Sequence, residues 1–517
     1  MKARFKKIVL KNRNRNSKFH SLISAVLTLL LLPCFVVARN AIEKHPVKGY
    51  ITINIQYKEA KPSDTITLII DEILNGGSGI DHDNLGSYKS TGHNGSFHFR
   101  VPVQQACGYF DLQKARTFTK GIGGALVMTL MNTCFWEVGD HILIHLSHKE
   151  APVQTYSTCS FSGKGAYKYQ MDYLTDSILN ATVVNNTRPA FDNTFRYFDY
   201  YPDKSKKALD LLEQNRKRLS NLSYRVLKAN IIYRTSRDSR FIEVLNFYDQ
   251  FIKNASPEIK ERFRKRLNEQ FAKNDMYGLG ETALLNSRRF FQYSFYKFRT
   301  LSIINYDHDD EQLVFNLMKQ QLRGRIRDKE LIFLLLNYEH SSDLTQLYKE
   351  AHYIVRDGIS SKILNHLIQS APGNYFTDFT LRDTTGKMVS SSEFRGRVVL
   401  IDFWFRGCGA CSGLYQNTLK ETEHAYKEDK DVVFVSINCD PIKRLWLVGI
   451  NEGIYTSSDA INLNTNGLGW NHPLFKSNHI PGFPFVVLLD KKGIIKYLNS
   501  ADLYNYKGLK AAIESVE

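Results

Sequence analysis

Apolar and polar residues alternate over short runs in the first part of the chain, from Val47 to about Phe161. A period of two residues is typical of β-strands with one buried face. Turn-forming sequences such as Asn75-Gly76-Gly77 separate the runs. We therefore predict an all-β, sandwich-like domain over residues 39–164. The clearest strands are predicted at residues 50–57, 65–70, 96–103 and 141–146.

The pattern changes at about residue 165, where apolar residues recur three and four positions apart. Leu209, Leu212, Leu219 and Leu222 illustrate this spacing, which indicates amphipathic helices. We predict an all-α region over residues 165–370, in which the many Tyr and Phe side chains serve packing. Neither this region nor the preceding one carries a recognisable catalytic motif.

A third pattern follows Ala371-Pro372-Gly373. The predicted order of elements is hairpin, strand, helix, strand, helix, strand, strand, helix, and the strands are continuous apolar runs. Such runs indicate a sheet that is covered on both faces. We predict an α/β domain over residues 371–517, with strands at 398–405, 432–438, 485–490 and 494–498 and a helix at 412–426.

The N-terminal leader is basic and then apolar. Eight Lys and Arg residues and no acid occur in the first 20 positions, and residues 21–38 are uncharged and rich in Leu. This order predicts an export signal or a membrane anchor over residues 1–38, with the rest of the chain outside the cytoplasm. Cleavage after Ala38 and retention of residues 21–38 in the membrane are both consistent with the sequence.

The charge distribution and the number of cysteines exclude two classes of protein, nucleic-acid-binding proteins and disulfide-rich scaffolds. Eight of the 17 net positive charges lie in the leader, and the others are spread over helices that also carry acids, so we exclude nucleic-acid binding. Six cysteines in the remaining chain are too few for a disulfide framework. Three of them are predicted to be buried apolar residues, namely Cys107, Cys134 and Cys159.

Cys408 and Cys411 carry the chemistry that we predict. They follow a buried strand and open a helix, and their spacing brings both sulfur atoms to one side of its first turn. The positive end of the helix dipole favours a thiolate, so Cys408 is the expected nucleophile. A zinc site would need a second pair of ligands at suitable spacing, and the sequence has none, so no metal is expected.

Asp402 lies within the apolar strand that leads to these cysteines. Burial of a carboxyl group should raise its pKa. Asp402 could then accept the proton of Cys411 when that thiol attacks a mixed disulfide. A purely structural carboxyl at the end of a strand is the alternative interpretation.

The segment from Val398 to Cys411 resembles the active-site strand and loop of thioredoxins, in particular the exported TlpA/ResA-like branch. Ile480-Pro481-Gly482-Phe483-Pro484 resembles the cis-proline segment of that branch. The resemblance covers residues 371–517 only. It implies a cis peptide before Pro484, with Pro481 as the competing candidate, and it assigns client binding to Trp404, Phe483 and Pro484. Departures from the family pattern are Gly407, Ala410, Gln416 and Phe485.

These residues predict an extracytoplasmic thiol-disulfide oxidoreductase that needs no organic cofactor. The resemblance implies that disulfide-bearing client proteins are reduced, that a membrane thiol carrier supplies the electrons, and that cytochrome c maturation is one destination. A thiol peroxidase is disfavoured because Phe405 stands where a peroxiredoxin has Thr. A binding or scaffold protein with a docked thioredoxin domain stays open as a second class.

Overall fold

The computed structural model describes residues 49–516, except 63, 72–84, 117–125, 150–155, 181–203, 238–239, 273–277, 338–343, 470–471, 479 and 481. The predicted leader and Pro481 lie outside the described residues. Within the described part, no helix combines the length and the apolar character needed to cross a membrane.

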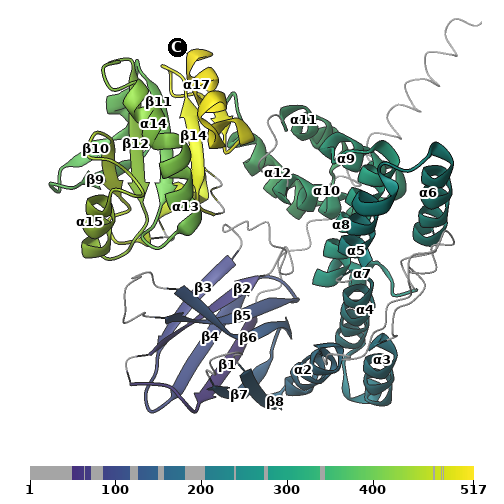
Figure 1. Cartoon of the computed structure of the whole chain (residues 1–517). Helices are drawn as coiled ribbons and strands as arrows, with labels where there is room; N and C mark the ends of the chain where they lie inside the picture. The colour runs from purple at the N-terminus through teal and green to yellow at the C-terminus, as the bar shows by residue number, and fades with distance from the viewer. Residues whose placement is uncertain are drawn as a thin grey trace, which may run out of the picture. The chain divides into compact units, whose positions relative to one another are not determined.

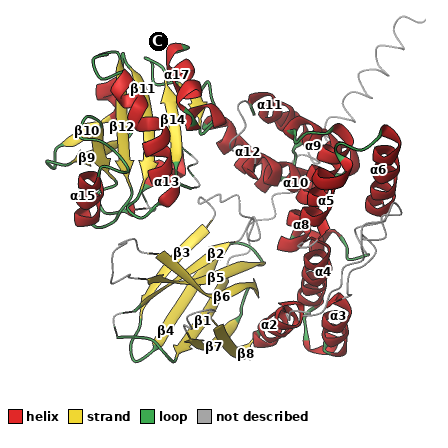
Figure 2. Ribbon diagram, in the orientation of Figure 1, coloured by secondary structure: helices red, strands yellow, loops and turns green. Residues whose placement is uncertain are grey.

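Two four-stranded sheets form the β region, with strand orders β4-β1-β7-β8 and β3-β2-β5-β6 (Figures 1 and 2). Inward-facing side chains of both sheets share one apolar core, as the strict alternation of buried and exposed residues along Ser96–Val103 illustrates. The predicted sandwich is confirmed. Its strands are β1 (Gly49–Tyr57), β2 (Thr65–Asp71), β3 (Leu85–Thr91), β4 (Ser96–Val103), β5 (Cys107–Arg116), β6 (Leu126–Glu137), β7 (His141–Lys149) and β8 (Tyr156–Lys164).

The middle of the chain is helical, as predicted, and its aromatic residues pack in one large core that includes Phe263, Phe298 and Tyr233. The α-helices are α2 (Ala166–Asn180), α3 (Lys204–Gln214), α4 (Asn221–Arg237), α5 (Arg240–Phe247), α6 (Pro257–Ala272), α7 (Glu281–Leu285), α8 (Arg288–Tyr306), α9 (Glu311–Gln321), α10 (Gly324–Asn337), α11 (Thr345–Ile354) and α12 (Gly358–Gln369).

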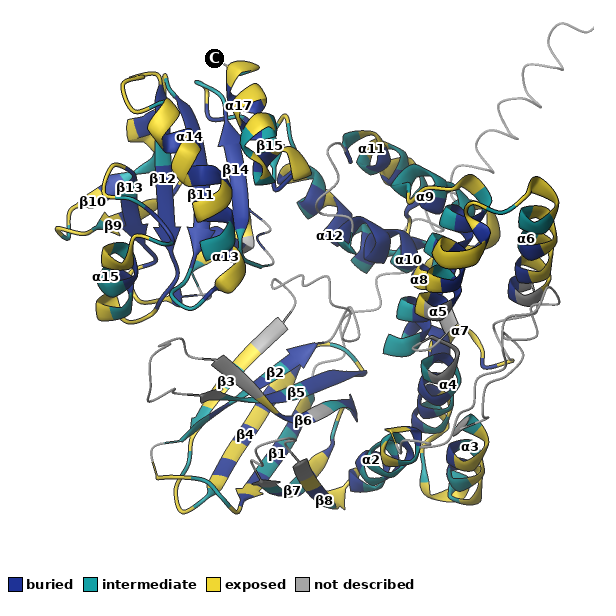
Figure 3. Ribbon diagram, in the orientation of Figure 1, coloured by how far each residue is buried: buried dark blue, intermediate teal, exposed yellow. Residues whose placement is uncertain are grey.

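The C-terminal part has a seven-stranded mixed sheet of order β10-β9-β13-β12-β11-β14-β15. Strand β11 lies in the interior of the sheet, parallel to β12 and antiparallel to β14, and all its residues are buried (Figure 3). The strands are β9 (Thr380–Asp383), β10 (Met388–Ser390), β11 (Val398–Trp404), β12 (Val432–Asn438), β13 (Ile461–Asn464), β14 (Phe485–Leu489) and β15 (Ile495–Leu498).

Helices cover both faces of this sheet, as the apolar strands predict. Val398 and Leu400 of β11 share an apolar cluster with the long helix that follows β11 and with α17, whereas Val399 and Ile401 pack on the side of α16. The α-helices are α13 (Gly409–Leu414), α14 (Lys420–Ala425), α15 (Lys443–Glu452), α16 (Pro473–Ser477) and α17 (Tyr506–Glu514).

The structure adds β13 and α16 to the predicted order of elements and moves the start of one helix. β13 was not predicted, because it is short and its polar residues Asn462 and Asn464 break the apolar pattern. The helix after β11 begins at Gly409 rather than at 412, and a π-helical turn over Tyr415–Leu419 joins α13 to α14. The π turn contains Gln416, one of the departures from the thioredoxin pattern.

Candidate active site

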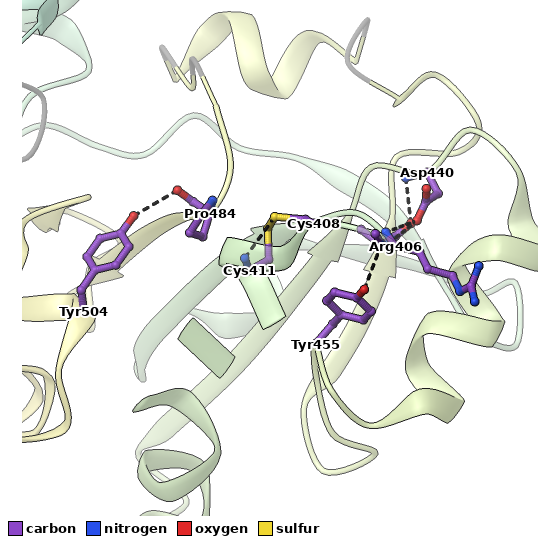
Figure 4. The surroundings of a disulfide bond; sticks show 9 residues. Arg406, Cys408, Cys411, Asp440, Tyr455, Pro484 and Tyr504 are labelled. Carbon is purple, nitrogen blue, oxygen red and sulfur yellow. Dashed lines mark hydrogen bonds between the residues drawn. A yellow bond between two sulfur atoms is a disulfide. The ribbon is translucent and has the colours of Figure 1, made fainter. Parts of the chain in front are cut away.

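The two cysteines lie where β11 ends and α13 begins. Cys408 is the N-cap residue of α13 and forms a disulfide with Cys411, with the two Cα atoms 5.3 Å apart. The backbone N–H of Cys411 donates to the Cys408 sulfur at 3.1 Å. In the reduced protein the same N–H group and the positive end of the helix would stabilise a thiolate on Cys408. The disulfide is shown in Figure 4.

Side chains from other elements hold the turn before Cys408. The Arg406 backbone N–H donates to the Asp440 carboxylate at 2.8 Å, and the Gly407 N–H donates to the Tyr455 hydroxyl at 2.9 Å (Figure 4). The Arg406 guanidinium pairs with Glu452 at 3.0 Å. Gly407 has φ +97°, which only glycine adopts without strain, so the turn before Cys408 requires glycine at this position. Asp440, Tyr455 and Glu452 were not predicted from the sequence, because no local motif marks them.

Trp404 lies beneath the cysteines rather than at the surface. Its ring has no exposed area and stacks on Tyr455, with centroids 5.0 Å apart and planes at 3°. Its indole N–H donates to the Ser436 hydroxyl at 2.8 Å. A fully buried ring has no surface to offer a client, so the predicted client contact of Trp404 is replaced by a packing role.

Asp402 is buried on the same strand face as Trp404, two residues earlier, and this face is covered by the helix that carries Cys411. The Ser436 hydroxyl donates to its carboxylate at 3.2 Å. Burial raises the pKa of Asp402 well above its ordinary value, and the negative charge of Glu423 raises this pKa further. Burial also raises the pKa of Glu423, to about 7. The burial and the raised pKa that the sequence predicts for Asp402 are therefore both present.

The Phe483–Pro484 peptide is cis, as the resemblance implies. Both residues are half-buried and line a groove of about 470 Å³ together with Ala410, which stands between the two cysteines. The structure thus brings the two cysteines and the cis-proline segment to one place. The Tyr504 hydroxyl donates to the Pro484 carbonyl on the side of Pro484 away from the disulfide (Figure 4).

Cys439 follows directly after β12, next to Trp404, and does not form a disulfide. Its backbone N–H donates to the Trp404 carbonyl at 2.9 Å, and the side chain is buried. Burial raises the pKa of the Cys439 thiol well above its ordinary value. Cys439 is therefore a packing residue. Among the described residues, no group of three His, Cys, Asp or Glu side chains is arranged to hold a metal ion.

A family comparison agrees with the geometry. Residues 371–513 match the Redoxin family. This part of the chain is a redoxin domain. The match confirms the predicted thioredoxin-family resemblance and marks the domain as a thioredoxin-like oxidoreductase. None of the curated proteins matches the chain.

Solved structures similar to the chain cover the same redoxin domain. The thioredoxin domain of a thiol-disulfide oxidoreductase from Bacteroides vulgatus is 27% identical over 28% of this chain and 99% of its own, with a TM-score of 0.25. A thiol:disulfide interchange protein from Bacteroides sp. is 28% identical over 28% of this chain and 89% of its own, with a TM-score of 0.24. A thiol-disulfide oxidoreductase from Bacteroides fragilis is 20% identical over 28% of this chain and 100% of its own, with a TM-score of 0.25.

Proposed function

We propose that this protein reduces the disulfides of client proteins outside the cytoplasm. The observation that carries the proposal is the Cys408–Cys411 disulfide at the start of α13, beside a groove and the cis Phe483–Pro484 peptide. A helix start lowers the pKa of a thiol and so favours the reactive thiolate. The neighbouring groove gives a client polypeptide room to bind.

The first step is attack of the Cys408 thiolate on a client disulfide. The client S–S bond breaks, a mixed disulfide forms between Cys408 and one client sulfur, and the other client sulfur leaves as a thiolate. Cys408 is the attacking residue because it caps the helix, where the Cys411 N–H and the helix dipole stabilise its thiolate.

The second step is attack of Cys411 on the Cys408 sulfur. Asp402 accepts the Cys411 proton, the Cys408–Cys411 disulfide forms, and the client leaves with both of its sulfur atoms reduced. The two electrons that the client gains come from the cysteine pair. An external dithiol, which we propose to be a membrane thiol carrier, must then reduce the pair before the next cycle.

Reduction of insulin tests this function. The full-length protein with dithiothreitol as electron donor should accelerate insulin precipitation over dithiothreitol alone, and Cys408→Ser should abolish the acceleration. Cys439→Ser is the matched control and should keep full activity, because that thiol is buried and its pKa is raised. No acceleration by the wild-type protein would contradict the proposal and favour a scaffold. Peroxide consumption that continues without any disulfide client would favour a peroxidase.

The proposed location rests on the leader, whose eight basic residues favour the cytoplasmic side. A fusion of alkaline phosphatase after residue 60 tests it, because this enzyme becomes active only after export. We expect an active fusion. An inactive fusion that is produced at normal level would contradict export, whether residues 21–38 are cleaved or kept as an anchor.

A further inference from the structure

The groove beside the disulfide has an uncharged lining. Its walls come from the first turns after Cys408, from the cis-proline segment and from the segment after β15. None of the described residues that line it carries a charge, and the polar groups are amides and hydroxyls. The lining includes Ala410, Gly413, Asn417, Phe483, Asn499 and Tyr504.

One side chain joins the cis-proline wall to the opposite wall. The Tyr504 hydroxyl donates its one proton to a pair of acceptors, the Pro484 carbonyl oxygen at 3.0 Å and the Asn499 side-chain oxygen, which share it. On its other side, the Tyr504 backbone carbonyl accepts a hydrogen bond from the Thr418 hydroxyl at 3.0 Å. Tyr504 therefore connects the helix after Cys408 with the carbonyl of the cis proline; the second of these contacts is drawn in Figure 4.

Two hydrogen bonds to Val486 of β14 hold Asn499 in place, and Asn499 in turn restricts the position of the Tyr504 hydroxyl. The Asn499 backbone N–H donates to the Val486 carbonyl at 2.7 Å, and its side-chain oxygen accepts from the Val486 N–H at 3.2 Å. The residue is buried and has φ +49°, a conformation that asparagine tolerates better than most residues. Through the Tyr504 hydroxyl, Pro484 is therefore linked to Asn499, whose backbone is hydrogen bonded to β14.

We infer that Tyr504 is a positioning residue for client binding, which fixes the Phe483–Pro484 wall of a groove that accepts an uncharged side chain next to the client cysteine. The inference rests on the proposed function. A charged client side chain would lose part of its hydration in the groove without gaining an opposite charge. Clients with uncharged residues beside the disulfide are therefore the preferred class.

The variant Tyr504→Phe removes the hydroxyl and keeps the ring. We expect KM for insulin to rise about threefold to tenfold, the range for loss of one hydrogen bond, with kcat nearly unchanged. Reduction of hydroxyethyl disulfide should keep its wild-type rate, because this small substrate does not fill the groove. Tyr497→Phe is the matched control, since its hydroxyl contacts Ser515 and does not line the groove; it should leave both substrates unaffected.

A second measurement needs no variant. Two peptides that differ only in Leu or Glu beside the disulfide are compared on the wild-type protein, and the Leu peptide should have the lower KM. Equal KM values, or equal slowing of insulin and hydroxyethyl disulfide by Tyr504→Phe, would overturn the inference while the oxidoreductase function stands. A wild-type protein that reduces none of these disulfides would overturn the proposed function itself.

Discussion

Cysteines in the β-sandwich and cysteines in the redoxin domain are equally shielded from solvent, yet only the pair in the redoxin domain lies at a helix start and forms a disulfide among the described residues. Cys107 and Cys159 are 7% and 8% exposed, whereas Cys408 and Cys411 are 6% and 4% exposed. Burial raises the pKa of the Cys107 and Cys159 thiols to about 12. Cys408 instead caps a helix and receives an N–H group from Cys411. Exposure alone therefore does not identify a reactive thiol; the dipoles and donors around the sulfur do.

The largest effect short of removing a redox cysteine is expected from Asp402→Asn. This variant keeps the size of the side chain but cannot accept the Cys411 proton, so release of the mixed disulfide should slow by at least about tenfold. Formation of the mixed disulfide on Cys408 should change little. Rapid-mixing kinetics separate the two steps, and equal slowing of both would show that Asp402 is structural.

Asp402→Asn should also change stability with pH. The pKa of Asp402 is raised in the folded state, so the folded protein holds this proton more tightly than the unfolded chain does. The stability that the wild-type protein gains at low pH is lost as pH rises from about 4 toward the raised pKa. The variant avoids this loss, so its Tm should exceed that of the wild type by at least about 2 °C at pH 8 and match it near pH 3.

A matched acid sharpens this test. Asp378 lies in the same domain at the surface, where it pairs with Arg395 at 2.9 Å. Asp378→Asn should not raise Tm at pH 8. A rise of similar size in both variants would indicate a general charge effect rather than the burial of Asp402.

A smaller effect is expected from Tyr455→Phe. This variant removes the oxygen that accepts from the Gly407 N–H, which leaves the turn before Cys408 less tightly held. Loss of one hydrogen bond of this kind costs about 1 kcal/mol. We expect a decrease of this size in the free energy of unfolding and a measurable change in the pKa of the Cys408 thiol, followed by the absorbance of its thiolate. An unchanged thiol pKa would show that Tyr455 supports the fold without influencing Cys408.

The smallest effect is expected in the sandwich. Cys159→Ala should leave insulin reduction within twofold of wild type, because a buried thiol with a pKa of about 12 is not a nucleophile at neutral pH. Its cost should be confined to stability, as expected for a small cavity in an apolar core. A large loss of reductase activity in a folded variant would break the distinction between the two sets of cysteines.

The sequence was sufficient for the parts of the fold that depend on local pattern. The apolar run of β11, the alternation along β4 and the position of Cys408 at a helix start all follow from residue type and spacing. β13 was missed because Asn464 is polar, and its amide proves to bind Asn438 and the Asp440 carbonyl in a buried network. Only the tertiary structure provides those partners.

The site was predictable to a similar degree. Cys408, Cys411 and Pro484 could be recognised because their motifs are local, and Asp402 because a carboxyl group is unusual in an apolar strand. Tyr455 and Asp440 could not, because each reaches the turn before Cys408 from a segment far along the chain. Gly407 was the one available signal, since a glycine before the first cysteine departs from the thioredoxin pattern and needs other groups to fix the turn.

Covalent trapping of clients in envelope extracts tests directly whether Cys408 is the nucleophile that attacks client disulfides. Cys411→Ser keeps the attacking Cys408 and loses the resolving thiol, so mixed disulfides should accumulate and disappear when dithiothreitol is added. Cys408→Ser should accumulate far fewer, because Cys411 lies within the first turn and does not cap the helix. Non-reducing gels followed by detection of this protein give the measurement. Identical adducts in both variants, or none in either, would contradict the assignment of Cys408 as the nucleophile.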